Sequence, residues 1–128
     1  MSSASRQATR SAEERRRALA SGREAEAWVA QELEERGWQV LDRNVHVGGG
    51  ELDLVVIREG CLRFVEVKAR QPGEDGLEAV TPYKQGKLRC AAEGWLQQHP
   101  EGFEEVAFLV AVVHMGPRWR LELLDDAF

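Results

Sequence analysis

GELDLVVIREGCLRFVEVKAR, which runs from Gly50 to Arg70, is the stretch of sequence that decides the fold. Two apolar runs flank the dipeptide Glu59-Gly60, and this pattern is typical of two β-strands joined by a two-residue turn. Such a turn pairs Arg58 with Cys61 and fixes the register of the hairpin, although Glu-Gly is a weaker turn signal than Asn-Gly. The stretch therefore predicts an antiparallel hairpin.

Acidic residues lie inside this predicted hairpin. Extending the register pairs Asp53 with Glu66 and Glu51 with Lys68, so two carboxylates and a lysine share one face. Like charges that face each other destabilise a sheet, and a carboxylate is rarely buried without a partner. A divalent cation between Asp53 and Glu66 removes this conflict, and Mg²⁺ or Mn²⁺ suits such oxygen ligands. The alternative is a charge cluster at a strand end, neutralised by Lys68 and Arg70.

Charge and length predict one folded domain with a basic N-terminal arm. The 128 residues have a net charge of −5, but residues 1–23 carry six arginines and two glutamates, so the remaining residues total −9. We expect a flexible Arg/Ser-rich arm over 1–20 and a single domain over 21–128. The acidic body argues against broad electrostatic binding of nucleic acid. The arm could follow phosphates, although a solubilising tail is the simpler interpretation.

Cysteine use and hydropathy predict a soluble, cytoplasmic protein. Cys61 and Cys90 have no metal-type spacing and form no disulfide framework. No apolar stretch near the N-terminus resembles a signal sequence, and none is long enough to cross a membrane. The longest apolar run, Val106–Val113, has the length of a buried strand.

The periodicity of the chain predicts a mixed α/β fold of order αβββαββ, with a central sheet of about five strands and flanking helices. The first helix is expected from near Ser21 to just before Gly37, and the capping-box spacing of Ser11 and Glu14 allows an earlier helical segment. The other predicted elements are a strand over Trp38–Asn44, a helix from Thr81-Pro82 to about His99, a buried strand over Val106–Val113 and an edge strand over Arg118–Leu124.

Each predicted helix carries one charged residue on its apolar face. Glu26 lies on the same face as Val29 and Leu33, and Lys84 lies on the same face as Trp95. For Glu26 the alternative is favourable placement near a helix N-terminus, with the carboxylate in solvent. For Lys84 the alternative is an ammonium that reaches solvent beyond an inward stem. In the functional interpretation, the ammonium group of Lys84 points at an anion near the acidic site.

Three glycines separate the first two predicted strands. Gly48-Gly49-Gly50 lacks the Gly-Lys-Ser/Thr ending of a phosphate-binding P-loop. The run is most simply a flexible turn, and it gives only a weak indication of close approach to phosphate.

These residues resemble the YraN family of bacterial proteins, whose hallmark reads G-E-I-D-L-I followed by F-V-E-V-K-x-R. The chain has GELDLVVI and FVEVKAR at the matching spacing. Asn44 matches the asparagine after the first strand, and Lys84 matches the lysine that opens the second helix. Ala25 replaces the usual helix glycine, which removes no catalytic group. The family's helix pattern, G-x-x-G-E-x-x-A with L and then G-[YF], matches Gly22, Glu26, Leu33, Gly37 and Trp38.

The resemblance implies a restriction-endonuclease-like fold with a PD-(D/E)xK active site, similar to archaeal Holliday-junction resolvases. It implies that Asp53 and Glu66 are the metal-binding acids, with the Val67 carbonyl as a third oxygen. Lys68 corresponds to the catalytic lysine, and Glu26 to an accessory helix acid. The residues expected to contact substrate are Lys84, Arg70 and Asn44.

The resemblance thus predicts an endonuclease that uses Mg²⁺ or Mn²⁺ and hydrolyses nucleic acid, with DNA favoured over RNA, structure-selective cleavage as in resolvases, and a homodimer able to cut two strands. Residues 21–128 would then form a single nuclease-like domain. A rival interpretation is a non-catalytic module on the same fold that binds nucleic acid or a protein. The acidic composition favours that rival, and the complete set of two acids and a lysine favours the enzyme. A third alternative is a purely structural ion cluster.

Overall fold

The computed structural model describes residues 12–73 and 80–128, with no side chain described over 13–21. The arm expected over residues 1–20 falls largely outside this part. The order αβββαββ is confirmed. Its elements are α2 (Ala12–Glu35), β1 (Gln39–Val47), β2 (Gly50–Arg58), β3 (Cys61–Arg70), α3 (Pro82–Gln97), β4 (Glu105–His114) and β5 (Arg120–Asp125).

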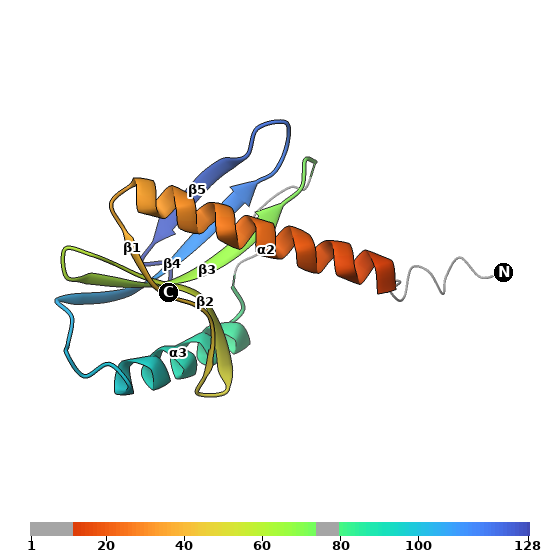
Figure 1. Cartoon of the computed structure of the whole chain (residues 1–128). Helices are drawn as coiled ribbons and strands as arrows, with labels where there is room; N and C mark the ends of the chain where they lie inside the picture. Colours follow the sequence, from red (N-terminus) through yellow and green to blue (C-terminus); the bar gives the residue numbers. More distant parts are fainter. Residues whose placement is uncertain (1–11, 74–79) are drawn as a thin grey trace.

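The strands form one five-stranded sheet of order β1-β2-β3-β4-β5. The β3–β4 pair is parallel, whereas the other neighbours are antiparallel. A parallel pair needs a crossover connection, which contains α3. Helices α2 and α3 lie on opposite faces of the sheet (Figure 1). The mixed sheet with flanking helices is therefore as predicted.

Each face of the sheet has its own hydrophobic core. Strand β4 lies between β3 and β5 and is buried along most of its length, which confirms the buried strand predicted over Val106–Val113. The α2-side core contains Ala25, Val29, Ala30, Leu33, Leu54, Val56, Val65, Leu109, Ala111 and Val113. The α3-side core contains Leu52, Val55, Leu62, Phe64, Leu88, Ala91, Ala92 and Trp95.

Helix α2 begins earlier than the main prediction. It starts at Ala12 rather than near Ser21 and contains 24 residues. The earlier start agrees with the alternative suggested by the spacing of Ser11 and Glu14, although Ser11 itself lies outside the described residues. The first turns of the helix extend past the sheet (Figure 1), so no core-facing periodicity was there to reveal them. Within the described residues, no helix is long and apolar enough to cross a membrane.

The β2–β3 hairpin has the predicted turn and register. Glu59 and Gly60 have φ angles of 52° and 80°, as a type I′ turn requires, and Arg58 pairs with Cys61. The paired ladder ends at Leu54 and Val65, however. The predicted ladder pairs Asp53–Glu66 and Glu51–Lys68 are therefore wrong, even though the register that led to them is correct.

A change of direction at Asp53 explains why the ladder ends. The Asp53 side chain takes the place of a backbone acceptor, because its Oδ2 accepts a hydrogen bond of 2.9 Å from the Val67 N–H. On β1, Asn44 has a φ of 50°, and the β1–β2 register skips the Asn44–Asp53 position. Leu54 packs on the α2 side, whereas Leu52 packs on the α3 side. Since residues two apart in a regular strand share a face, the strand rotates at Asp53.

The rotated end of the β1–β2 hairpin packs directly on α3. A Cβ added to Gly50 would lie 2.5 Å from the Lys87 carbonyl oxygen, and one added to Gly94 would lie 2.7 Å from Val47 Cγ2. A Cβ at Gly48 would collide with the Cys90 carbonyl. The predicted turn is present at Gly48 and Gly49, and Gly48 and Gly50 are in addition packing residues against α3. Their close contact fixes where β2 enters the sheet.

Two glycines within α3 offer a matched test of this packing. Ala stabilises a helix interior relative to Gly, and an alanine at Gly86 would meet no atom within 4 Å, so Gly86→Ala should gain about 0.5–1 kcal/mol. The same gain at Gly94 is opposed by the collision with Val47 and the Gly48 backbone. We expect Gly94→Ala to be less stable than Gly86→Ala by about 1–3 kcal/mol in urea denaturation. Equal stabilities would contradict the packing.

Candidate functional site

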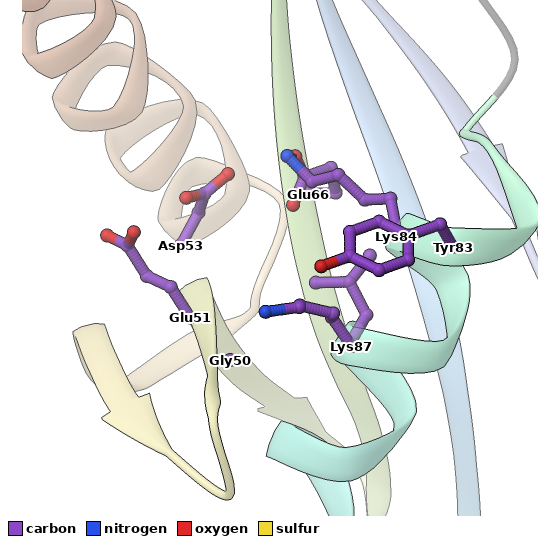
Figure 2. Close-up of a pocket in the computed structure, with 8 residues that line it drawn as sticks. Gly50, Glu51, Asp53, Glu66, Tyr83, Lys84 and Lys87 are labelled. Atoms are coloured by element: carbon purple, nitrogen blue, oxygen red, sulfur yellow. The ribbon is translucent and has the colours of Figure 1, made fainter.

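A cleft of about 270 Å³ opens where β2 leaves β3. Acidic side chains from the strands lie on one side of it, and lysines from the first turns of α3 lie on the other (Figure 2). The residues that line it are Gly50, Glu51, Asp53, Glu66, Tyr83, Lys84, Lys87 and Leu88. The rotation of β2 at Asp53 and the packing of its first residue on α3 together create this space.

Asp53 is held in an environment that disfavours its charge. Burial raises the pKa of Asp53 to about 7, and the nearby charge of Glu66 adds to the rise. The hydrogen bond from the Val67 N–H acts in the opposite direction. At neutral pH a bound proton or a nearby cation would therefore stabilise this carboxyl group.

Glu66 is the more deeply buried acid, with a residue exposure of 7%. Its Oε1 lies 3.1 Å from the Nζ of Lys84, which reaches across the cleft from α3 (Figure 2). Burial opposes the charge of Lys84, but attraction and hydrogen bonding to Glu66 outweigh it and raise the lysine pKa. Lys84 therefore pairs with an acid of the site itself, and its role toward a separate anion stays a prediction.

Glu26 joins the acids from the opposite helix. Its carboxyl group is half-buried, and its pKa is raised by that burial, with further contributions from Glu51 and Glu66 and an opposing hydrogen bond with Asp53. The alternative, a surface acid near a helix N-terminus, is wrong because α2 begins at Ala12, more than three turns before Glu26. The structure therefore places Glu26 beside Asp53.

The remaining predicted site residues lie outside the cleft lining. Lys68 follows Glu66 on the same strand face and is half-buried, but no hydrogen bond or ion pair connects it to another described residue. Arg70 has buried Nε and Nη2 atoms with no hydrogen-bond partner in the described part of the chain. Such a guanidinium suits an anion that arrives later. Asn44 is exposed, and its left-handed backbone serves the kink of β1.

Sequence reasoning did not identify three of the residues that line the cleft as site residues. Glu51 appeared only as a register partner, and neither Lys87 nor Tyr83 was singled out. Lys87 Nζ lies 5.4 Å from the Tyr83 ring centroid, so these two side chains form a cation–π pair at the rim. The helical spacing of four residues between them was a usable signal.

The oxygen atoms of the cleft fit a hard divalent cation with few protein ligands. No group of three or more His, Cys, Asp or Glu side chains arranged for metal binding occurs among the described residues. Asp53 and Glu66 provide two carboxylates. The Val67 N–H points at Asp53, and since the N–H and C=O of one strand residue face the same edge, its carbonyl faces the same side. Two carboxylates with added waters are typical of Mg²⁺, which dehydrates reluctantly.

The fold and the cleft define a class of protein: a mixed α/β domain with acids and lysines facing each other beside a rotated strand. Residues 25–113 match the sequence profile of UPF0102, described as an uncharacterised protein family. The chain belongs to the UPF0102 family. This membership confirms the YraN-like identity expected from the motifs, and the description states no activity.

Several relatives carry the same family name. A UPF0102 protein of Granulibacter bethesdensis is 41% identical over 113 residues, which cover 88% of this chain and 70% of the relative. One from Synechococcus sp. is 46% identical over 75% of this chain and 76% of its own length. One from Rhodopseudomonas palustris is 45% identical over 66% of this chain, and the match spans 65% of that relative. These names state the family and do not state an activity.

The raised pKa of Asp53 predicts how stability depends on pH. The unfolded group titrates near its ordinary value of 3.8 and the folded group near 7, so stability falls as the pH rises between these values. Asp53→Asn removes the charge and should raise the free energy of unfolding by about 2–4 kcal/mol at pH 8, with little gain at pH 4. Urea denaturation at both pH values measures this.

A matched control is Glu51→Gln, which changes an acid in the same cleft whose side chain is 49% exposed. Exposed charges contribute little to stability, so this variant should change little at either pH. If Asp53→Asn is less stable than the wild type at pH 8, the electrostatic description of the site is wrong.

Proposed function

We propose that this protein is a metal-dependent nuclease that hydrolyses phosphodiester bonds in nucleic acid. The observation that carries the proposal is the acid pair, Asp53 and Glu66, held at the edge of a lysine-lined cleft. A protein gains no stability from such a pair without a cation. The matching acid-acid-lysine pattern of the PD-(D/E)xK active site supports the same chemistry by resemblance.

The two carboxylates and the Val67 carbonyl would hold Mg²⁺ or Mn²⁺. Such a cation, when bound, polarises a phosphoryl group and lowers the pKa of a coordinated water. Asp53 is already oriented for this role, because the Val67 N–H holds one of its oxygens. Glu26, close to Asp53, would accept a hydrogen bond from a water at the same place.

The cationic side chains would act on the nucleic acid. Lys68, on the same strand face as Glu66, would orient the attacking water or stabilise charge that develops on the phosphate. Lys84 and Lys87 line the cleft and would contact phosphates at its mouth. The Nε and Nη2 atoms of Arg70, which have no hydrogen-bond partner among the described residues, would bind a further phosphate.

The finer features of the proposed activity derive from the resemblance to resolvase-like nucleases. DNA is favoured over RNA, a branched or otherwise structured substrate is favoured over a plain duplex, and a homodimer would allow two strands to be cut. The cleavage experiment below tests the two substrate preferences.

A second candidate is a non-catalytic module that binds nucleic acid or a protein on the same fold. Two observations favour it. The chain beyond residue 23 has a net charge of −9, which opposes tight binding to phosphate backbones. In addition, no hydrogen bond or ion pair joins Lys68 to either acid in the described part of the chain.

A cleavage panel distinguishes the two candidates. Labelled single-stranded, duplex, flap and four-way-junction DNA, and a matched RNA strand, are incubated with wild-type protein and Mn²⁺. We expect metal-dependent cutting that falls by about 100-fold or more in Asp53→Asn and in Glu66→Gln. Glu93→Gln, which changes an exposed acid on α3, is the matched control and should cut as the wild type does.

Each outcome of the cleavage and Mn²⁺-binding measurements supports a different interpretation of the site. Equal cutting by Asp53→Asn and wild type would overturn the assignment of the acid pair. Mn²⁺ binding by the wild type without turnover on any substrate would support the non-catalytic module. Absence of Mn²⁺ binding and of cleavage would support a structural ion cluster.

A further inference from the structure

Lys84 occupies a position that a divalent cation would also need. Its Nζ lies 3.1 Å from Glu66 Oε1, at the centre of the cleft (Figure 2). Glu66 is held on β3, which is hydrogen-bonded to a neighbouring strand along its parallel edge, and its side chain is only 9% exposed. A carboxylate buried to this degree needs a compensating charge. Lys84 provides it.

The other cations of the described residues do not share this role. The ion pairs of the described part of the chain join Glu66 to Lys84, and none joins it to Lys68 or Lys87. Lys87 lies beside the Tyr83 ring at the rim instead. Glu66 and Lys84 therefore form a specific pair within a more general gathering of charges.

The position of Lys84 in α3 is unfavourable unless something offsets it. Thr81 caps the helix by accepting a hydrogen bond from the Lys84 backbone N–H, so Lys84 lies in the first turn. The positive end of the helix dipole repels a cation there. Glu66 offsets that repulsion, and an anion at the cleft mouth would offset it as well.

The two side chains also differ in freedom. The side chain of Lys84 is 48% exposed and has four methylene groups, so its ammonium can move toward solvent without unfolding any element. Glu66 projects from the middle of the sheet and has no such freedom. If the pair separates, the lysine moves and the carboxylate stays.

We propose that Lys84 is an internal counter-ion that competes with the divalent cation for Glu66 and transfers to a substrate phosphate when the cation binds. This role rests on the function proposed above. An ammonium beside Oε1 repels a second cation at that oxygen and lowers its apparent affinity. Arrival of phosphate at the cleft mouth gives the displaced ammonium a new partner, so metal and substrate favour each other's binding.

The test compares full-length wild type with Lys84→Met, Lys84→Arg and Lys87→Met. Mn²⁺ affinity is measured by titration, and melting temperature is measured with and without Mn²⁺. Without metal, Lys84→Met should melt at a lower temperature than the wild type, because Glu66 loses its counter-ion. With metal, the same variant should bind Mn²⁺ about tenfold more tightly and gain more melting temperature.

The controls isolate the charge at this one position. Lys84→Arg retains the cation and should keep an Mn²⁺ affinity close to that of the wild type. Lys87→Met removes a cation from the same cleft that does not touch Glu66, and it should change both readouts far less. Lys84→Gln gives the same comparison should Lys84→Met fail to fold.

Two results would contradict the proposed competition between Lys84 and the cation for Glu66. In the first, the wild type binds Mn²⁺, and Lys84→Met and Lys84→Gln bind it with the same or a weaker affinity. Lys84 would then not compete with the cation, and the proposed nuclease function would stand. Absence of Mn²⁺ binding in every variant and in the wild type would overturn the proposed metal chemistry together with this role of Lys84.

Discussion

The site depends on one hydrogen bond, in which the Val67 N–H donates to the Asp53 carboxylate at 2.9 Å. A regular hairpin would use a backbone carbonyl of β2 as the acceptor. Because a side chain takes its place, the β2–β3 ladder ends at Leu54 and Val65. The remainder of β2 is then able to turn toward α3, where Gly50 packs against the Lys87 backbone. The same interaction thus ends the ladder, opens the cleft and orients a carboxylate within it.

The electrostatics of the cleft follow from this geometry. Burial and the charge of Glu66 raise the pKa of Asp53 to about 7, and burial raises that of Glu26 on the opposite helix. Lys84 compensates Glu66, while Asp53 is left with a hydrogen-bond donor rather than a cation. Groups whose environment disfavours their charge cluster at functional sites, because structural needs alone would select apolar residues there. The raised pKa values of Asp53 and Glu26 therefore support the function proposed above.

Much of this could be predicted from local sequence. Period-two apolar patterning and the Glu59-Gly60 turn were sufficient for the hairpin register, and helix-start signals such as Thr81-Pro82 were sufficient for α3. The end of the ladder could not be predicted, because it depends on a tertiary contact made by the Asp53 side chain. The burial and the ion pairs of Arg63 could not be predicted for a similar reason. It is buried within β3, and its partner acids come from β4 and β5, which only the sheet order brings beside it. The start of α2 was placed too late because the sequence of its first turns has no apolar periodicity.

The most direct measurement is an anomalous diffraction experiment on crystals of the full-length protein soaked in Mn²⁺. We expect one anomalous peak between the carboxylates of Asp53 and Glu66, with the ammonium of Lys84 withdrawn from Glu66. A soaked crystal with no peak at this position, and with Lys84 still paired to Glu66, would contradict this expectation.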